Sequence, residues 1–395
     1  MKVLVIPSWY PPDGGSFFVE QIQALQKIGI EDISVIYSEP LGVRKILKDG
    51  FITSLKKFSE STAPDFGIST LRNKYFCFPR SEFINLFLQT RSTLHLFEDY
   101  IKKNGMPDII HVHSSLWAGW PAYLFKKRYG IPYVITEHRS RFTLTYPTAR
   151  QAIKPWYTLF LSKILNNANH LILVGKHLIN GLRQYINSNV EPPISVISNG
   201  VYTEKFILKT KSVMNPFVFI AVAGLEKRKG FDILLTAFAS LVDKYKRQVH
   251  LRIVGDGPEK KNLINLCNSL NLNDNVTFLG KLSRDDVAAA LRDSDAFVLA
   301  TRWEAQGVCF LEALSCGLPI IATHAVPEEI CPSFVGYRVN IDSTEELQNA
   351  MQDVYENYDR FDNAKIREYA VLNFDFKVVA KRISEIYEQV LCCHI

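Results

Sequence analysis

Two glutamates eight positions apart, Glu304 and Glu312, are the residues of this 395-residue chain whose types and spacing point most directly to chemistry. The apolar run Ala296–Ala300 before them predicts a buried strand. A pattern with helical spacing begins near Gly307 and ends at Gly317, and another apolar run follows. The stretch therefore predicts a strand, a loop that carries Glu304, a helix that carries Glu312, and a second strand.

A helix that starts near Gly307 would point its free backbone N–H groups, with Val308 among them, and the positive end of its dipole into that loop. Such a helix end binds phosphate. Glu304 could accept hydrogen bonds from sugar hydroxyls, and Glu312 could hold the two hydroxyls of a ribose. The arrangement suits a diphosphate between two sugars. The alternative is that both acids are solvated helix charges, which the apolar neighbours of Glu312 make less favourable.

A cationic loop could hold the same diphosphate from the other side. The apolar run Phe217–Ala223 predicts a strand, and the loop after it contains Lys227, Arg228 and Lys229. For Lys227 and Arg228 the alternative is an ordinary solvated run of charge. The glycine fingerprint of a dinucleotide-binding site is absent from the loop after the first predicted strand, so a dehydrogenase is not favoured.

Strands alternate with helices through both halves of the chain, which predicts an α/β fold of two doubly wound domains with a cleft between them. In the first half the expected strands are Lys2–Pro7, Ile33–Tyr37, Asp108–His113, Ile131–Glu137, His170–Val174 and Ile194–Ser198. In the second half they are Phe217–Ala223, His250–Val254, Val276–Gly280, Ala296–Ala300 and a run from Ile320.

The string Glu304-Ala-Gln-Gly-Val-Cys-Phe-Leu-Glu312, with Ala-Leu-Ser-Cys-Gly-Leu-Pro-Ile-Ile-Ala-Thr after it, resembles family 4 glycosyltransferases, which are retaining enzymes of the GT-B fold. The resemblance is strongest from about residue 196 to 327 and weak between about 40 and 105. It implies two Rossmann-like domains that face each other across a cleft. An acceptor-binding domain is expected at residues 1–205 and a donor-binding domain at 206–375. The last helix, within residues 376–395, is expected to cross back to the first domain.

The resemblance also implies roles for residues that match the family's motifs. Lys229 would contact the donor phosphates, Glu304 the donor sugar and Glu312 the ribose, while His138 would position the sugar near the reaction centre. Of these, His138, Glu304 and Lys229 are the expected catalytic residues. The other implied donor-side positions are Gly15, Gly224, Arg228, Gly255, Gly257, Leu282, Gly307 and Val308, and the acceptor-side positions are Gly14 and His113.

One departure from the family pattern bears on function. The usual Gly-Arg-Leu string is replaced here by Ala223-Gly224-Leu225, so a phosphate-binding arginine is missing and Lys227 or Arg228 would have to take its place. This favours, as one alternative, a non-catalytic subunit that binds a nucleotide sugar. An epimerase of the same fold is a second alternative. A phosphorylase of this fold would need a pyridoxal phosphate lysine and a much longer chain.

The expected reaction transfers a sugar from a UDP- or GDP-linked donor to an acceptor hydroxyl with retention, in the synthesis of cell-surface polysaccharide or glycolipid. No cofactor is expected besides the donor, and no metal. We interpret Asp293-Ser-Asp295 as structural, because it directly precedes a buried strand. Asp108, His111, His113 and His138 could be imagined as a metal site, but they form no convincing ligand set.

The net charge of +6 is uneven, because residues 1–200 contain 23 Lys/Arg and 14 Asp/Glu, whereas residues 201–395 contain 23 and 26. A basic first half favours an anionic partner such as a lipid-linked acceptor or a membrane surface, or is simply a soluble basic surface. The basic, amphipathic segment 44–58 is either a peripheral membrane contact or a packed helix. With no long apolar run and no signal peptide, we expect a cytoplasmic protein, with contact to the inner face of the plasma membrane left open. No nucleic-acid partner is expected.

Overall fold

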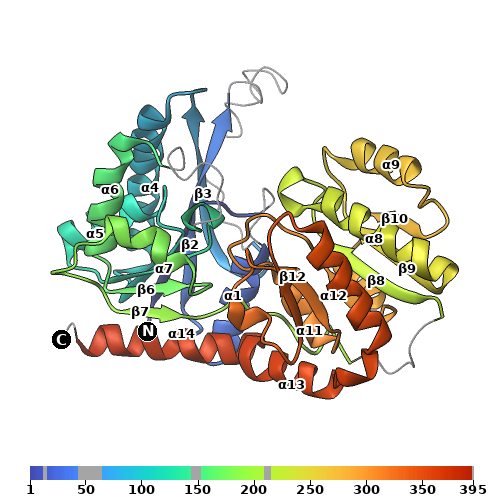
Figure 1. Ribbon diagram of the computed structural model, residues 1–395. Coiled ribbons are helices and arrows are strands. Elements are labelled where there is room, and N and C mark those ends of the chain that lie inside the picture. The colour runs from blue at the N-terminus through green and yellow to red at the C-terminus, as the bar shows by residue number, and fades with distance from the viewer. Residues whose placement is uncertain (12–15, 43–64, 144–152, 209–214, 394–395) are drawn as a thin grey trace. The chain divides into compact units, whose positions relative to one another are not determined.

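A computed structural model describes residues 1–11, 16–42, 65–143, 153–208 and 215–393. The chain forms two compact units (Figure 1). The first comprises residues 1–139, 150–197 and 379–395, and the second comprises 140–149 and 198–378. Each unit is a parallel sheet flanked by helices, which confirms the predicted α/β class.

The first unit is built on a seven-stranded sheet in the order β3-β2-β1-β4-β5-β6-β7. Its strands are β1 (Val3–Pro7), β2 (Ile33–Gly42), β3 (Ser69–Cys77), β4 (Ile109–His113), β5 (Tyr133–Glu137), β6 (His170–Leu173) and β7 (Ile194–Val196). Its helices are α1 (Ser16–Lys27), α4 (Glu82–Asn104), α5 (Gly119–Tyr129), α6 (Pro155–Asn166) and α7 (Leu178–Leu182). All residues of β1, β4, β5 and β6 are buried, as expected for strands covered on both faces.

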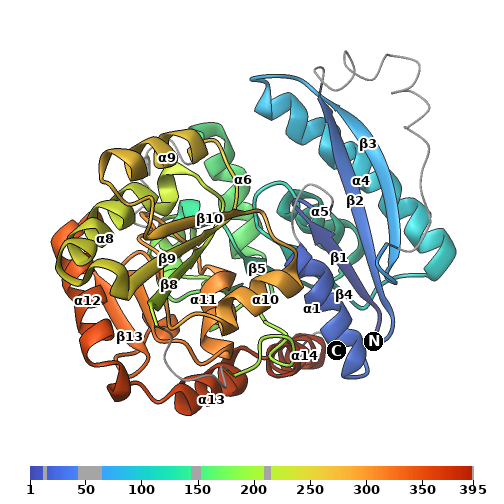
Figure 2. The same ribbon diagram turned by 90° about the vertical axis from the view of Figure 1, so that its right-hand side faces the viewer.

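Strands β2 and β3 run well past the end of β1, as Figure 2 shows. β1 pairs only with residues 33–35 of β2, whereas β2 and β3 pair from residue 34 to residue 42 of β2. Helix α4 packs on both of these long strands. The sequence did not predict β3, because this edge strand contains Arg72, Asn73 and Lys74 and only part of it is buried.

The second unit has a six-stranded sheet in the order β10-β9-β8-β11-β12-β13. Its strands are β8 (Phe217–Val222), β9 (Val249–Val254), β10 (Val276–Gly280), β11 (Ala296–Val298), β12 (Ile320–Thr323) and β13 (Gly336–Val339). Its helices are α8 (Phe231–Tyr245), α9 (Lys260–Ser269), α10 (Arg284–Arg292), α11 (Val308–Ser315), α12 (Thr344–Glu356) and α13 (Asn363–Phe374). The direction in which the chain adds strands reverses between β8 and β11, and such a switch point is where doubly wound sheets bind ligands.

The long last helix, α14 (Phe376–Cys392), begins in the second unit and belongs to the first unit from Val379 onward. Its buried side includes Val379, Ile383 and Tyr387. The Tyr387 hydroxyl lies 2.5 Å from Nδ1 of His111 in β4. Helix α14 is therefore joined to the sheet of the first unit by a buried polar contact as well as by apolar packing.

Within the described part of the chain, no helix is both long enough and apolar enough to span a membrane. The same residues contain no cluster of three or more His, Cys, Asp or Glu side chains that could hold a metal ion. Asp295 of the Asp-x-Asp string is fully buried and accepts a hydrogen bond from the backbone N–H of Val218 in β8, at 2.7 Å. That contact holds the end of α10 against the sheet.

Candidate functional site

Two loops meet at the switch point of the second sheet, one after β8 and one after β11. The first loop contains a short 3₁₀ helix, η3 (Lys227–Lys229), and Gly230 follows it. Gly230 has a φ of 66°, and a Cβ placed there would lie 1.9 Å from the carbonyl oxygen of Ala300 in the second loop. Only glycine combines this backbone conformation with so close an approach. The basic loop is therefore pressed against the loop that carries Glu304.

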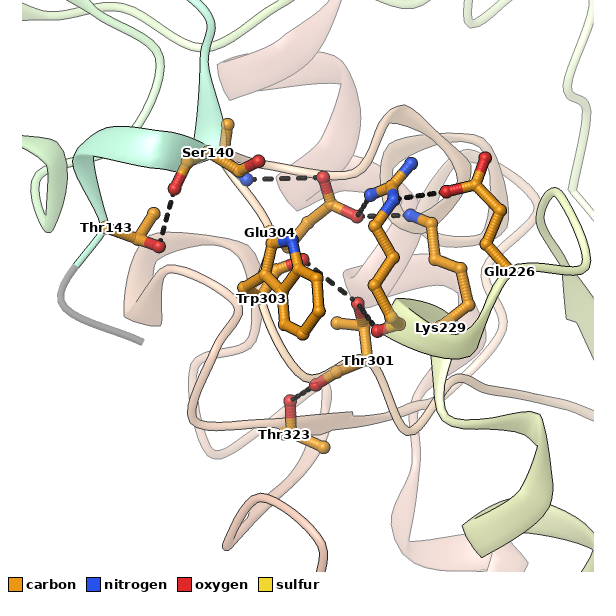
Figure 3. Close-up of polar contacts among 10 residues, drawn as sticks. Ser140, Thr143, Glu226, Lys229, Thr301, Trp303, Glu304 and Thr323 are labelled. Carbon is orange, nitrogen blue, oxygen red and sulfur yellow. Dashed lines mark hydrogen bonds and ion pairs between the residues drawn. The ribbon is translucent and has the colours of Figure 1, made fainter. Parts of the chain in front are cut away.

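A buried ion pair joins these two loops (Figure 3). Lys229 donates a hydrogen bond from Nζ to Oε2 of Glu304, although the two residues are 75 positions apart. Arg228 lies beside the same carboxylate, with Nη1 3.8 Å from Oε2, and also contacts Glu226 at 2.6 Å. Lys227 is exposed. Of the two candidates for the missing arginine, Arg228 is therefore the one placed at the Glu304 carboxylate.

The electrostatics of the two glutamates differ. Burial raises the pKa of Glu304, but the charge and hydrogen bond of Lys229, with the charge of Arg228, outweigh burial and leave that pKa below its usual value. Burial raises the pKa of Glu312 to about 7, and the charge of Arg284 only partly opposes this. The Arg284 guanidinium lies 3.4 Å from the Glu312 carboxylate. Glu304 is thus held ionised, whereas Glu312 titrates near neutral pH.

Helix α11 begins at Val308 with Gly307 as its N-cap, so its first N–H groups point away from the helix interior beside Glu304. Cys309, in the first turn, lies within the fields of Lys229, Glu304 and Glu312, and burial raises its pKa to about 12. The thiol is therefore uncharged. The predicted site residues Lys229, Arg228, Glu304 and Gly307 thus converge on one loop junction.

The glycines predicted to face the donor have a structural explanation of their own. Gly255 has a φ of 139°, and a Cβ placed there would lie 1.9 Å from the carbonyl oxygen of Ala223. A Cβ on Gly257 would lie 2.5 Å from the carbonyl oxygen of Leu225. Both glycines leave room for the loop after β8. Contact between protein segments is therefore enough to explain why glycine is required at these positions, without the approach of a ligand. A Cβ on Gly224 would meet no atom closer than 3.5 Å, and Leu282 is a partly buried residue at the edge of the core.

Sequence reasoning missed Arg302, which braces the basic loop. Its guanidinium binds Asp232 at 2.8 and 3.0 Å and Asp342 at 2.6 Å, and it also donates to the carbonyl oxygen of Lys227. The backbone N–H of Arg302 donates to the carbonyl oxygen of Arg228 at 2.8 Å. A charged residue two positions before Glu304, in a stretch of largely buried residues, was the signal that could have found it.

Gln306 is a second residue that sequence reasoning left without a role. Its Oε1 accepts a hydrogen bond from the backbone N–H of Asn199 at 2.8 Å, and its Nε2 donates to the hydroxyl of Ser198. Both partners are buried and lie at the start of the second unit. The loop that carries Glu304 is therefore also held by the hydrogen bonds of Gln306 to Ser198 and Asn199.

In the first unit the structure gathers three histidines at the ends of β4 and β5. Nδ1 of His113 lies 3.0 Å from Nε2 of His138, and the ring of Phe18 packs against both. His111 hydrogen-bonds to Thr136 at 2.7 Å as well as to Tyr387. Burial lowers the pKa of His111 to about 3 and that of His113 well below its usual value.

These contacts bear on the predicted role of His113. Its side chain is fully buried, which favours a role in holding His138 over direct contact with an acceptor. The predicted positions Gly14 and Gly15, and the basic segment 44–58, lie outside the described residues.

A pocket of about 400 Å³ lies in the first unit and is lined by residues of β2, β3 and α4 and of the loops after β1, β3, β4 and β5. The polar residues in its lining include Ser38, Arg80, Glu82, Gln89 and Arg139. Among the described residues, Glu82 is the acid in this lining, and Lys154 contacts it at 3.3 Å. The volume of the pocket falls in the range of small-molecule sites. We call it the polar pocket.

Two family models match the chain. The model described as Glycosyltransferase Family 4 matches residues 63–205, and the model described as Glycosyl transferases group 1 matches residues 203–371. Together they cover most of the sequence. The chain belongs to glycosyltransferase family 4. The loop junction of Lys229 and Glu304 therefore lies in a glycosyltransferase of the GT-B type, within the part that the second model matches.

Curated relatives agree with this assignment. The chain is 28% identical over 298 residues to the N-acetyl-alpha-D-glucosaminyl L-malate synthase of Bacillus anthracis, covering 72% of this chain and 75% of the relative. It is 26% identical over 353 residues to an Escherichia coli UDP-Gal:alpha-D-GlcNAc-diphosphoundecaprenol alpha-1,3-galactosyltransferase, covering 84% of each. Among solved structures, sucrose-phosphate synthase from Thermosynechococcus elongatus has a TM-score of 0.75 over the full length of both chains at 19% identity, which supports the fold.

Proposed function

We propose that this family 4 glycosyltransferase moves a sugar from a UDP- or GDP-linked donor to an acceptor hydroxyl with retention and without a metal. The observation that carries the proposal is the Lys229–Glu304 pair at the amino end of α11. A buried cation, a carboxylate and the free N–H groups of a helix thus meet at the switch point of a doubly wound sheet. A diphosphate sugar needs all three kinds of partner.

The proposed catalytic task is to stabilise the leaving diphosphate. Negative charge grows on that group as its bond to the sugar breaks, and fixed positive partners lower the barrier most when they are already in place. Lys229, Arg228 and the N–H groups of Gly307 and Val308 supply them. Because Lys229 is bound to Glu304, we expect the incoming diphosphate to share the ammonium with that carboxylate. The N–H groups at the helix end would take the remaining charge.

The two glutamates would hold the sugars on either side of the diphosphate. Glu304 is ionised because its basic neighbours hold its pKa down, so its carboxylate can accept hydrogen bonds from donor-sugar hydroxyls. Glu312, whose carboxylate lies 3.4 Å from the Arg284 guanidinium, would hold the ribose. His138, held by His113, would position the donor sugar near the reaction centre.

Residues 1–205 with 376–395 are proposed to bind the acceptor, and residues 206–375 to bind the donor. The E. coli relative is named for a UDP-linked donor and a diphosphoundecaprenol acceptor. We therefore favour a UDP-linked sugar and a lipid-linked acceptor for cell-surface polysaccharide or glycolipid synthesis. The site of action would then be the cytoplasm, with peripheral contact at the inner face of the plasma membrane.

The test is a thermal-shift panel of UDP, GDP and their sugars, followed by a transfer assay that measures release of the nucleoside diphosphate. Binding that is specific for one base stabilises the folded state and raises the melting temperature. Release of UDP or GDP with the favoured sugar supports a transferase. Conversion of the sugar without release indicates an epimerase. Tight binding with neither reaction on any acceptor indicates a non-catalytic subunit and overturns the proposal.

A further inference from the structure

Helix α4 separates two cavities of opposite character in the first unit. Glu82, Asn85 and Gln89 line the polar pocket, whereas the intervening residues of the same turns line a second cavity of about 400 Å³. This second cavity, which we call the aromatic groove, is lined by Phe83, Leu86, Phe87, Thr90, Arg91, Leu94, Trp120, Leu124 and Phe160. One short stretch of helix therefore has a polar cavity on one face and an apolar cavity on the other.

The aromatic groove is open to solvent although nearly all of its lining is apolar. Phe83 is 57% exposed and Phe87 is 65% exposed, one helical turn apart on α4. Trp120 of α5 and Phe160 of α6 complete the wall, with ring centroids 4.5 Å apart. Exposed apolar surface of this kind marks a place where an apolar partner binds.

The polar pocket is built for a charged, hydroxyl-bearing group. Arg80 and Arg139 line it, and Lys154 contacts its Glu82. Gln89 is 6% exposed, and its Oε1 is buried with no hydrogen-bond partner among the described residues. A buried acceptor of this kind is costly unless a ligand donates to it.

The charged residue in the lining of the aromatic groove is Arg91, which favours an anionic partner. The other Lys/Arg residues of α4, α5 and α6 lie in the last turns of these helices and do not line the groove. The adjacent pairs Glu82/Phe83, Asn85/Leu86 and Gln89/Thr90 each place one residue in either cavity, so the two cavities flank the same turns of α4 from its amino end onward. A flexible chain that passes this end could occupy both cavities.

We propose that the acceptor is an amphiphile whose anionic head group enters the polar pocket while its hydrocarbon chain passes the amino end of α4 and lies in the aromatic groove. The inference rests on the proposed function, because it names the class of acceptor for the same reaction. A chain of a few carbons cannot pass a helix whose diameter is about 10–12 Å, so affinity depends on chain length.

The test compares the binding of butyl phosphate, dodecyl phosphate and farnesyl phosphate, all below their aggregation thresholds, by titration calorimetry with the whole protein. Dodecyl phosphate is expected to bind at least about a hundredfold more tightly than butyl phosphate, because its additional methylene groups leave water. A preference for farnesyl phosphate identifies a polyprenyl source, and a preference for dodecyl phosphate identifies an acyl-type source.

Two variants test where the hydrocarbon chain of the ligand binds. Phe83→Ser/Phe87→Ser is expected to reduce the chain-length effect to less than about threefold, with butyl phosphate binding unchanged. Because both side chains are more than half exposed, the fold should tolerate the change, and Phe87→Ser alone is the milder variant. The matched control is Phe66→Ser, whose side chain is 58% exposed elsewhere in the same unit and which should retain the full effect.

Three outcomes overturn the inference. They are affinity independent of chain length, a chain-length effect that survives Phe83→Ser/Phe87→Ser, and sedimentation of a wild-type dimer that this variant dissociates. The last would show that the groove binds a second copy of the chain. Thermal shifts with UDP and GDP are measured on the same samples. Nucleotide binding without chain binding would refute only the inference, and chain binding without nucleotide binding would refute only the proposed donor.

Discussion

The two units bury polar clusters at the same edge of their sheets, but one cluster is neutral and the other is charged. In the first unit His111, His113 and Tyr387 are buried, and burial keeps the two histidines uncharged. In the second unit Lys229 and Glu304 are buried as an ion pair. The two units therefore bury polar groups of different electrostatic character.

This difference shows what each cluster can do. Neutral hydrogen-bonded side chains fix geometry at little desolvation cost, which suits the positioning of an uncharged sugar or hydroxyl. A buried ion pair stabilises the fold weakly, because loss of solvation offsets the attraction between its charges. Such a pair can, however, exchange partners with an incoming anion. The predictions below test what each cluster contributes.

The largest effect is expected from Lys229→Ala. It removes the buried cation, so turnover should fall at least about a hundredfold, the size of losing one donor that stabilises developing charge. The free energy of unfolding should also fall, by up to about 3–5 kcal/mol, because Glu304 stays buried after losing its nearest positive partner and Arg228 at 3.8 Å compensates only in part. Steady-state kinetics and denaturant melts of folded samples measure the two effects. Lys227→Ala, on the same turn but exposed, is the control, and near-normal turnover of Lys229→Ala would remove this residue from the mechanism.

The next effect concerns pH and Glu312. Its pKa of about 7 in the folded protein exceeds the value of 4.5 typical of glutamate, so between these values the folded state binds a proton that the unfolded chain releases. The free energy of unfolding should therefore fall as pH rises through this window, by about 3 kcal/mol in total. Glu312→Gln should abolish this fall in melts recorded between pH 4.5 and 8. Glu345→Gln, an exposed residue of α12, should keep it, and a wild-type curve that is flat across the window would contradict the assignment.

A smaller effect is expected from Arg302→Lys. Lysine keeps the charge but cannot bridge Asp232, Asp342 and the carbonyl oxygen of Lys227 at once. The basic loop should shift slightly, lowering kcat/KM for the donor about tenfold with little change in KM for the acceptor. Arg247→Lys, at an exposed position, is the control. Equal losses for donor and acceptor would indicate general destabilisation instead.

The smallest effect is expected in the neutral cluster. Tyr387→Phe removes the hydroxyl that contacts His111, so the free energy of unfolding should fall by about 1 kcal/mol. Turnover at saturating substrates should change little, because no charge is involved. Denaturant melts and steady-state rates check both statements, and a loss of turnover comparable to that of Lys229→Ala would show that the neutral cluster takes part in the chemistry.

The sequence by itself determined the repeated strand–helix pattern and the helix that begins after Gly307, because the spacing of apolar residues reflects local burial directly. It also determined the family, because the family motif is nearly continuous in the sequence. It did not reveal the edge strand β3, which has no distinctive local pattern. It did not reveal the brace formed by Arg302 either, because a charge in a largely buried stretch does not specify its partners.

Only the tertiary structure decided which distant side chains meet. Lys229 reaches Glu304 across 75 positions, and Tyr387 reaches His111 across 276, because the order of strands in each sheet brings these segments together. The choice of Arg228 over Lys227, and the division of α4 into a polar and an apolar face, likewise depend on which neighbours pack against each turn. Local periodicity specifies that a residue is buried, whereas its partner is specified by chain topology.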